Sequence, residues 1–497
     1  MKVQLSQLAC DAYSGSAVDG PLLRTGRGEV ESPMDKREFL KSTGALVAGS
    51  VLGCAARGEQ PGTTGAISAP AADAGSGATP RTNWAGNLTY GTTNLQTPAT
   101  VEEVRAAVKA AGKLRALGAR HSFNTIADST HEQISLEHLT EISLDEKART
   151  VKVGGGVTYS QLAPWLDSRG FALHNLASLP GITVAGACAT ATHGSGLHNG
   201  NLATAVSAVE FVTANGDLIE LRRDRDGERF LGAVVGLGAV GVVTRTTLDL
   251  QPTYKVAQSV YQGLSFDELG RHFEQVFASG YSVSVFTDWQ QHRAGEVWVK
   301  RRLQPGDANH WEPELFGAKL ATVKLHPLAG HPTENVTDQL GIPGPWYDRL
   351  PHFRIGQTPS GGNELQTEYF VPWDRGFEAV LAVEKLHERI GPCLMITELR
   401  TIAPDRLWMS MAYDRPSLSI HFTWKPLWPQ VQQVLPLIEA ELKPFAPRPH
   451  WGKLFTLEPP MLEAQYTRLP EFKRMASQSD PQGKFRNAFL RANLYEA

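Results

Sequence analysis

Apolar residues recur at helical spacing shortly after residue 97. The apolar positions are valines, of which the first is Val101 and the last is Val108. Thr100 directly precedes them, and Glu103 follows three positions after Thr100. A hydroxyl residue with a glutamate at this distance is the signature of a capping box, which satisfies the free amides at the start of a helix. The pattern predicts a helix over residues 100–111.

Short apolar runs, glycine turns and one further helical pattern alternate up to about residue 252. The runs that predict strands are residues 114–117, 150–153, 171–176, 208–213 and 218–221. Residues 158–170 have helical spacing and end at Gly170, a common helix terminator. Asn215-Gly216 separates the last two runs and predicts a hairpin turn.

From about residue 254 the pattern changes to longer alternating strands and longer helices. Strands are predicted at residues 282–286 and 297–300, and helices at residues 376–390 and 429–442. A chain of 497 residues also exceeds one hydrophobic core, because cores stop growing at roughly 250–300 residues. We therefore predict an α+β protein with two core-bearing domains and a large antiparallel sheet in the second.

The domain boundaries follow from these changes in pattern. Residues 82–252 form the first predicted domain and residues 253–475 the second. Residues 476–497 are polar and rich in turn formers, and we expect them to return to the first domain. Residues 1–81 are predicted to be a leader followed by a flexible tether, because residues 58–80 are rich in Gly, Ser, Ala and Pro.

The leader contains a pattern typical of export. Lys36-Arg37 precede a short apolar stretch of small residues at 42–53, which is too short to span a bilayer and resembles a twin-arginine signal. Cys54 ends a sequence similar to a lipoprotein cleavage box, so it is a candidate lipid anchor. The alternatives are a buried N-terminal helix and a cytoplasmic protein. Met34 is a candidate true start of translation.

Composition narrows the function to small-molecule chemistry. The net charge of −3 offers no basic field for nucleic acid or anionic lipid. Four cysteines are scattered without metal-ligand spacing, so neither a metal site nor a disulfide framework is predicted.

A run of very small side chains at residues 177–196 is the densest chemical signal. Its four glycines fit neither the dinucleotide-binding fingerprint nor a P-loop. Small residues let backbone amides approach a ligand closely, as in loops that hold pyrophosphate. The alternative is a flexible surface loop.

A second candidate site is residues 118–124, which contain His121. A single histidine is more often a surface or core residue than a functional one. This one follows a glycine turn at the end of a predicted strand, where an imidazole could bond to an electrophilic cofactor carbon.

The order of these motifs carries a resemblance. Residues 118–124, 154–156, 177–196 and 236–244 are similar to the FAD-binding domain of vanillyl-alcohol oxidase-type flavoproteins, and the whole of residues 82–497 resembles the alditol (xylitol/sorbitol) oxidases. Residues 83–87 and 450–453 belong to the match.

The resemblance implies a bound FAD, attached covalently through His121. It departs from the family at Arg120, where a glycine is expected. The implied cofactor-binding residues are Gly118, Ala119, Arg120, His121, Ser122, Ser178, Thr183, Gly186, Thr190, Ala191, Thr192, His193, Val243 and His450.

Polar residues at predicted strand positions of the second domain are the candidate substrate site. Glu398 and Arg400 share one face of a strand, as do His421 and Thr423 in another. The pattern alone is equally consistent with a surface salt bridge and ordinary exposed residues. The resemblance favours polyol binding. The implied substrate-binding residues are Ser178, Glu398, Arg400, Thr423 and Lys453, the last in the segment 450–453, which is also predicted at a strand position.

The resemblance implies oxidation of a primary hydroxyl of a small polyol, with O2 reduced to H2O2. The catalytic candidates are Lys453, Arg400 and His421, with Lys453 or His421 accepting the proton. A quinone or cytochrome acceptor remains open.

Two alternatives are an aldonolactone oxidase or dehydrogenase of the same fold, and a cell-surface carbohydrate-binding lipoprotein. For the second, the binding platforms would be Trp289, Trp298, Trp311, Trp424 and Trp451.

Overall fold

The computed structural model describes residues 80–356 and 363–495. The predicted signal, Met34, Cys54 and almost all of the tether lie outside these residues. Within them, no helix is both long and apolar enough to cross a membrane. The described residues belong to one compact unit. The domain boundary near residue 252 therefore stays a prediction, although it coincides with a change from one set of sheets to another.

Two of the sheets in the first half have three and five strands. The parallel sheet has strand order β1-β3-β2, with bounds Leu95–Gln96, Glu132–Ser135 and Leu114–Leu117. The antiparallel sheet has order β4-β5-β9-β7-β8, with bounds Ile142–Asp145, Thr150–Gly154, Val242–Asp249, Val206–Val212 and Leu218–Arg222. The predicted hairpin is confirmed: β7 pairs with β8 across a turn in which Gly216 has a φ of 80°.

The helices of the first half are α1 (Val101–Ala110), α2 (Tyr159–Asp167), α3 (Val184–Ala189) and α4 (Arg223–Val234). Thr100 caps α1 by accepting the amide of Glu103, so that prediction is confirmed. The strand predicted over residues 171–176 was too long. Only β6 (Phe171–Ala172) pairs, with β10 (Gln251–Pro252), because the chain then turns toward the small-residue run.

A ten-stranded sheet dominates the second half. Its order is β14-β15-β11-β13-β12-β18-β19-β17-β20, with β16 added beside β11. The bounds are Glu314–Leu315, Ala318–Leu320, Lys255–Ser265, Arg293–Leu303, Ser282–Thr287, Leu394–Ile402, Ser417–Trp424, Leu365–Pro372, Arg448–Pro449 and, for β16, Gly344–Pro345. The predicted antiparallel sheet is therefore confirmed.

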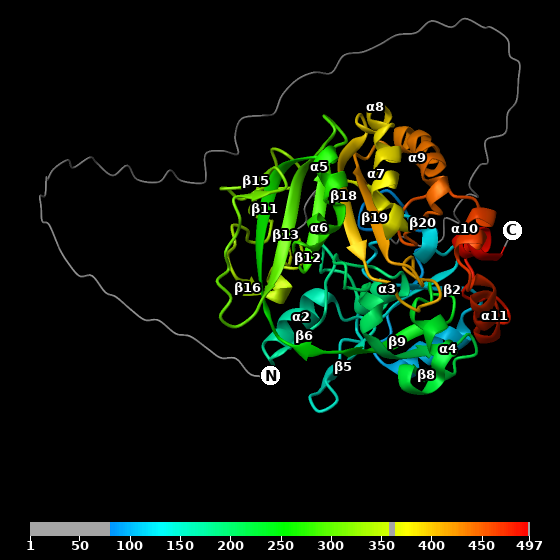
Figure 1. The fold of residues 1–497 in the computed structure, drawn as a ribbon. Helices are drawn as coiled ribbons and strands as arrows, with labels where there is room; N and C mark the ends of the chain where they lie inside the picture. Colours follow the sequence, from blue (N-terminus) through cyan, green and yellow to red (C-terminus); the bar gives the residue numbers. More distant parts are fainter. Residues whose placement is uncertain (1–79, 357–362, 496–497) are drawn as a thin grey trace, which may run out of the picture. The chain divides into compact units, whose positions relative to one another are not determined.

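Helices cover one face of this sheet (Figure 1). They are α5 (Phe266–Arg271), α6 (Phe273–Ala278), α7 (Gly376–Glu384), α8 (His387–Ile390) and α9 (Trp428–Leu442). Successive strand residues point to opposite faces. Tyr369 of β17 reaches Glu439 on α9, so its neighbour Glu368 points to the opposite face.

Two predictions about this half need correction. The helix over residues 376–390 is interrupted at Lys385-Leu386, giving α7 and α8. Residues 450–453 are a turn after β20, rather than a strand. This turn is held by the Lys453 amide donating to the His450 carbonyl, and the His450 amide donates to Glu368 of β17.

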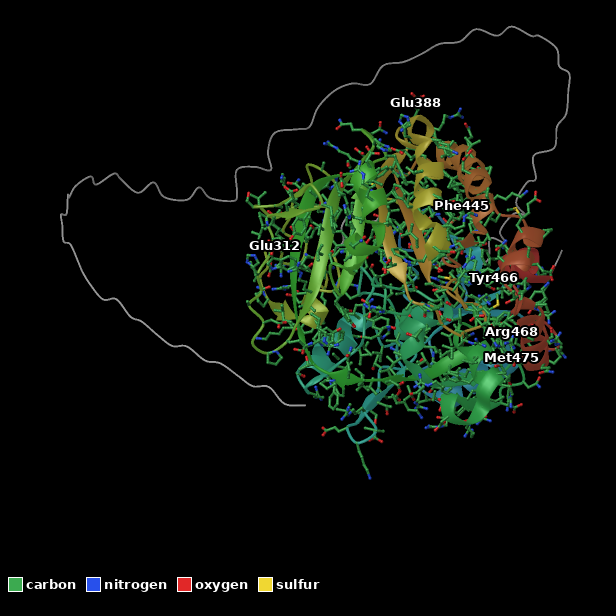
Figure 2. The ribbon with its side chains drawn as sticks, viewed as in Figure 1. Glu312, Glu388, Phe445, Tyr466, Arg468 and Met475 are labelled. Atoms are coloured by element: carbon green, nitrogen blue, oxygen red, sulfur yellow. The ribbon has the colours of Figure 1, made fainter. Side chains whose placement is uncertain are left out.

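The C-terminal residues pack on the first half. The Leu114 amide of β2 donates to the Lys484 carbonyl, and the Asn487 side chain donates to three carbonyls within residues 125–128. Figure 2 shows Tyr466, Arg468 and Met475 along one edge of the molecule, near α10 (Pro459–Gln465) and α11 (Leu469–Ser479).

Candidate active site

One large pocket lies where the first half meets the face of the ten-stranded sheet that carries Glu368. Its wall on one side comes from the motifs around His121 and from the small-residue run. Its other side comes from β17, β18, β19 and the turn at residues 450–453. The two sides are joined directly, because the Gly196 amide donates to the carbonyl of Thr401 in β18.

The first side is shaped by backbone at close range. An added Cβ on Gly118 would lie 2.7 Å from Thr183 Oγ1, and one on Gly186 would lie 2.8 Å from the same atom. A Cβ on Gly155 would lie 2.6 Å from the Val243 carbonyl oxygen. Thr183 also caps α3 by accepting the Gly186 amide. These positions need the smallest side chains, so the wall exposes main chain to a ligand.

His121 stands in this wall with no hydrogen-bonding partner. Its ring stacks on Trp84 with centroids 4.5 Å apart, and both ring nitrogens are buried without a partner. Burial lowers the pKa of His121 to about 4, although the nearby Ala119 backbone opposes part of the shift. The imidazole is therefore neutral at physiological pH, and a neutral imidazole is nucleophilic.

The backbone conformation at Arg120 is one that favours glycine, the residue expected at this position from the resemblance. Its φ is 63°, in the left-handed region that costs non-glycine residues roughly 1–2 kcal/mol. The arginine side chain is exposed, so the departure from the family motif strains the backbone without filling the pocket.

Arg115 is a lining residue that sequence reasoning missed. Its buried guanidinium donates to the carbonyls of Gly238, Leu237, Ile126 and Phe485. Leu237 and Gly238 have φ values of 51° and 65°. One buried cation thus fixes a strained loop of the pocket wall and the C-terminal segment together. A basic residue within an otherwise apolar strand is the only sequence signal for it.

The histidine motif and the lysine turn are docked to each other. The Phe123 amide donates to the Gly452 carbonyl at 2.8 Å, and the Asn124 side chain donates to the carbonyls of Trp451 and Lys453 at 2.9 and 2.7 Å. A Cβ on Gly452 would lie 3.3 Å from Ser122 Oγ. The nucleophilic histidine and Lys453 are therefore held in one rigid unit despite their separation in sequence.

The other side of the pocket is a charged cluster centred on Glu368. Its Oε1 accepts from Arg400 Nη2 at 2.9 Å and His193 Nε2 at 3.0 Å, and its Oε2 accepts from Lys453 Nζ at 2.6 Å. Burial alone would raise the pKa of Glu368, but Lys453, His193 and Arg400 hold it well below its usual range. The carboxylate is ionised and faces donors from three segments.

His421 lies between two carboxylates. In the strand register it pairs with Glu368 of β17 on one side and Glu398 of β18 on the other. Its Nδ1 lies 3.3 Å from Arg400 Nη2, and its Nε2 is buried without a partner. Burial, reinforced by Lys453, lowers the pKa of His421 to about 4. A neutral ring with one free nitrogen thus lines the pocket.

Glu398 acts behind this cluster. Its Oε1 accepts from His352 Nε2 at 2.7 Å, and Lys300 Nζ lies 3.1 Å from His352 Nδ1. Burial would raise the pKa of Glu398, but Arg400 and His352 hold it well below its usual range. Lys300 and His352 were not singled out from the sequence, because His352 comes from a loop outside the strands and only the tertiary fold brings the two residues near Glu398.

Most predicted site residues meet in this pocket. Those that line it are Gly118, Ala119, Arg120, His121, Ser122, Ser178, Thr183, Gly186, Thr190, Thr192, His193, Val243, Arg400, His421, His450 and Lys453. Three do not line it. Ala191 is fully buried, Glu398 lies behind Arg400, and Thr423 lies beside the lining residue Gln366 in the strand register. These three residues were predicted to contact cofactor or substrate, but in the structure they support the pocket wall from behind.

The tryptophans do not form a carbohydrate platform. Trp289, Trp298, Trp424 and Trp451 are 0–1% exposed, and Arg301 stacks on Trp311. The surface that a carbohydrate-binding protein would use is therefore missing at these residues.

The pocket fits FAD on its own features. Close-packed glycines leave main chain facing the ligand space, and the unpartnered His121 nitrogens lie in the same wall. An extended cofactor with a pyrophosphate and an electrophilic ring matches both.

Comparisons with known families agree with this geometry. Residues 94–222 match the FAD binding domain family, and residues 363–493 match the D-arabinono-1,4-lactone oxidase family. The second match spans Glu368, Arg400, His421 and Lys453, whereas His193 of the same cluster lies within the first match.

Individual relatives cover nearly their whole length. An alditol oxidase from a Streptomyces species is 46% identical over 415 residues, covering 82% of this chain and 98% of the relative. An L-gulono-1,4-lactone dehydrogenase from Mycobacterium tuberculosis is 26% identical over 437 residues, covering 83% and 98%. A cholesterol oxidase from B. sterolicum has the same fold, with a TM-score of 0.68 at 16% identity over 84% of this chain and 96% of that one.

The sequence identity to the Streptomyces alditol oxidase, and the share of both chains that it covers, assign the protein to a family. Nearly half of the aligned positions are shared with the Streptomyces alditol oxidase across almost its entire length, and the FAD-binding domain match covers the wall that carries His121. The chain belongs to the alditol oxidase family of FAD-dependent oxidoreductases.

Proposed function

We propose that the protein oxidises a primary hydroxyl of an alditol such as xylitol or sorbitol to the aldose, reducing O2 to H2O2, with FAD attached through His121. The observation that carries the proposal is the pair of cations, Lys453 and Arg400, held at one pocket wall opposite the His121 wall. The 46% identical relative named as an alditol oxidase supports the substrate class.

Oxidation of an alcohol removes a hydride from carbon and a proton from oxygen. When bound, FAD supplies the hydride acceptor. The Arg400 guanidinium and the Lys453 ammonium or amine would hold the reacting hydroxyl and stabilise negative charge that develops on its oxygen. The side chains of Lys453 and Arg400 are 12% and 5% exposed, so water screens them little.

Lys453 is the better proton acceptor. An Arg N–H can only donate, so the contact from Arg400 leaves His421 Nδ1 as an acceptor and the ring proton on Nε2. His421 would then donate to a substrate hydroxyl. Burial lowers the pKa of Lys453, with Glu368 opposing and Arg400 adding to the shift, so its neutral form is accessible.

Covalent attachment is supported by the state of His121. The ring is neutral, stacked on Trp84 and without competing hydrogen bonds. A nitrogen lone pair facing the ligand space is what bonding to the flavin 8α-methyl carbon requires.

O2 as the acceptor is supported by resemblance and by the small Ala177 beside Ser178 in the pocket lining, which leaves room for oxygen. A quinone or cytochrome acceptor would give turnover with a dye but little H2O2.

The second candidate is oxidation of an aldonolactone. It is favoured by the family match over residues 363–493 and by the 26% identical lactone dehydrogenase. Side-by-side assays with xylitol, sorbitol and a gulonolactone, following O2 uptake, H2O2 and the oxidised product, decide between the two. We expect kcat/KM to be higher for xylitol or sorbitol than for the lactone; the reverse order would overturn the alditol proposal.

We also propose export by the twin-arginine-like signal, with Cys54 as a lipid anchor. Mass spectrometry of the precursor and the mature protein tests this. Peptides upstream of Met34 would contradict the proposed start, and a mature protein that retains residues before Cys54 would contradict the anchor.

A further inference from the structure

Glu368 binds groups from four separate parts of the chain. His193 comes from the small-residue run, Arg400 from β18, Ser419 from β19 and Lys453 from the turn after β20. His193 belongs to the opposite side of the pocket, so this one carboxylate ties the two sides together.

Both oxygens of this carboxylate are already bonded within the protein. Its side chain is 0% exposed, Oε1 accepts from three side chains, and Oε2 accepts from Lys453. Glu368 lines the pocket together with Arg400 and Lys453, and it can influence substrate through these groups that it holds.

The Glu368 carboxylate compensates the charges of two neighbouring cations. Two cations, Lys453 and Arg400, are buried within reach of the same carboxylate. Without it they would repel each other in a low-dielectric site, and each would be left with less compensation for its buried charge. With it, both cations can face one small volume of the pocket.

We propose that Glu368 is a positioning residue, which fixes Lys453 and Arg400 at the substrate hydroxyl and links them through His193 to the flavin side of the pocket. The inference rests on the proposed alditol oxidation. In the sequence, the only signal for this role is that Glu368 is the single charged residue of β17.

Several charged or titratable groups face Lys453 from the surrounding elements. Glu368 and Glu398 raise its pKa, whereas Arg400 lowers it. The buried rings of His193, His421 and His450 have lowered pKa values, chiefly from burial, and carry little charge near neutral pH. Neutralising Glu368 must therefore lower the pKa of Lys453.

The test compares Glu368→Gln with Glu439→Gln in the full holoprotein. Glu439 is a matched control, because it is also a buried carboxylate beside β17, accepting from Tyr369 and Thr456, but it lies on the helix-covered face outside the pocket. Both variants lose a buried carboxyl group, and only one loses the contact with Lys453.

The first readout does not need turnover. Acetic anhydride labelling of the Lys453 peptide at a series of pH values, quantified by mass spectrometry, reports the pKa of that amine. We expect Glu368→Gln to lower it by about one unit or more and Glu439→Gln to leave it unchanged. Equal values in the wild type and Glu368→Gln would overturn the proposal.

The second readout is kcat/KM with xylitol as a function of pH. Glu368→Gln should lose about 100-fold at its optimum, with flavin still bound, and its acidic limb should move to lower pH. A loss no larger than that of Glu439→Gln, with an unmoved limb, would contradict the role. If the wild type turns over no alditol, the proposed function fails, while the labelling result still decides the position and charge of Lys453.

Glu368→Asp separates charge from position. It keeps the carboxylate but withdraws it by one methylene, so the Lys453 pKa should return toward the wild-type value while kcat stays reduced. Full recovery of both would contradict a role in positioning.

Discussion

The two sides of the pocket are built in different ways. The flavin side consists of main chain and very small side chains, contributed by short continuous motifs such as residues 118–124 and 177–196. The substrate side consists of charged side chains, each from a different strand or turn. A local motif can specify the first, whereas only the register of a ten-stranded sheet specifies the second.

This difference predicts that mutations on the two sides fail differently. Damage to the charged side should remove turnover and leave the cofactor, whereas damage to the flavin side should change how the cofactor is held.

Lys453→Ala should have the largest effect. It removes both a donor for the developing alkoxide and the proposed proton acceptor, so kcat/KM with an alditol should fall by about 1000-fold or more. The absorbance spectrum should keep its flavin bands. Loss of flavin together with activity would show that Lys453 helps to hold the cofactor, and it would contradict the division of the pocket into a substrate side and a flavin side.

His121→Ala should leave the protein able to bind FAD but unable to retain it after acid precipitation. The imidazole is the proposed point of attachment, and the glycine wall around it is unchanged by the substitution. Yellow colour in the acid pellet of the variant would contradict attachment at His121. Ser122→Ala is a suitable control in the same motif, because its pellet should stay yellow.

Acid should destabilise the protein through its buried histidines. The pKa values of His352 and His421 are lowered to about 4, so between the unfolded value near 6.5 and about 4 the unfolded chain binds more protons than the folded one. Stability is thus lost as pH falls through this window, by up to about 3 kcal/mol for each residue. Tm measured from pH 7 to 4 should fall steadily, and less steeply in His421→Asn; equal slopes would contradict the buried neutral state.

Arg120→Gly should have the smallest effect. Glycine tolerates the φ of 63° that strains arginine, so the variant should gain about 1 kcal/mol and roughly 1 °C in Tm. Flavin content should not change. A fall in Tm would show that contacts of the arginine outweigh the backbone strain.

The sequence predicted the elements of the first half and the flavin side of the pocket in detail because their signals are local. Thr100, the hairpin at Asn215-Gly216 and the glycines of residues 177–196 each express a rule that acts over a few residues. His121 was found for the same reason, since it follows a strand and a glycine turn.

The centre of the substrate side could not be predicted in this way. Glu368 is the only charged residue of β17, and its partners are 32 to 175 positions away in the chain. Arg400, His421 and Lys453 were identified by resemblance. Strand spacing alone could not distinguish them from ordinary polar residues on the protein surface. A lone charge in an otherwise buried strand was the available signal, but its meaning depends on partners that only the register supplies.

The most direct test of the account is an absorbance spectrum of the purified protein before and after acid precipitation, followed by anaerobic addition of xylitol to the native sample. The account predicts flavin bands that stay with the precipitated protein and bleach in the native sample with xylitol. Flavin that remains in the supernatant would contradict attachment through His121, and covalent flavin that xylitol does not bleach would contradict the alditol substrate.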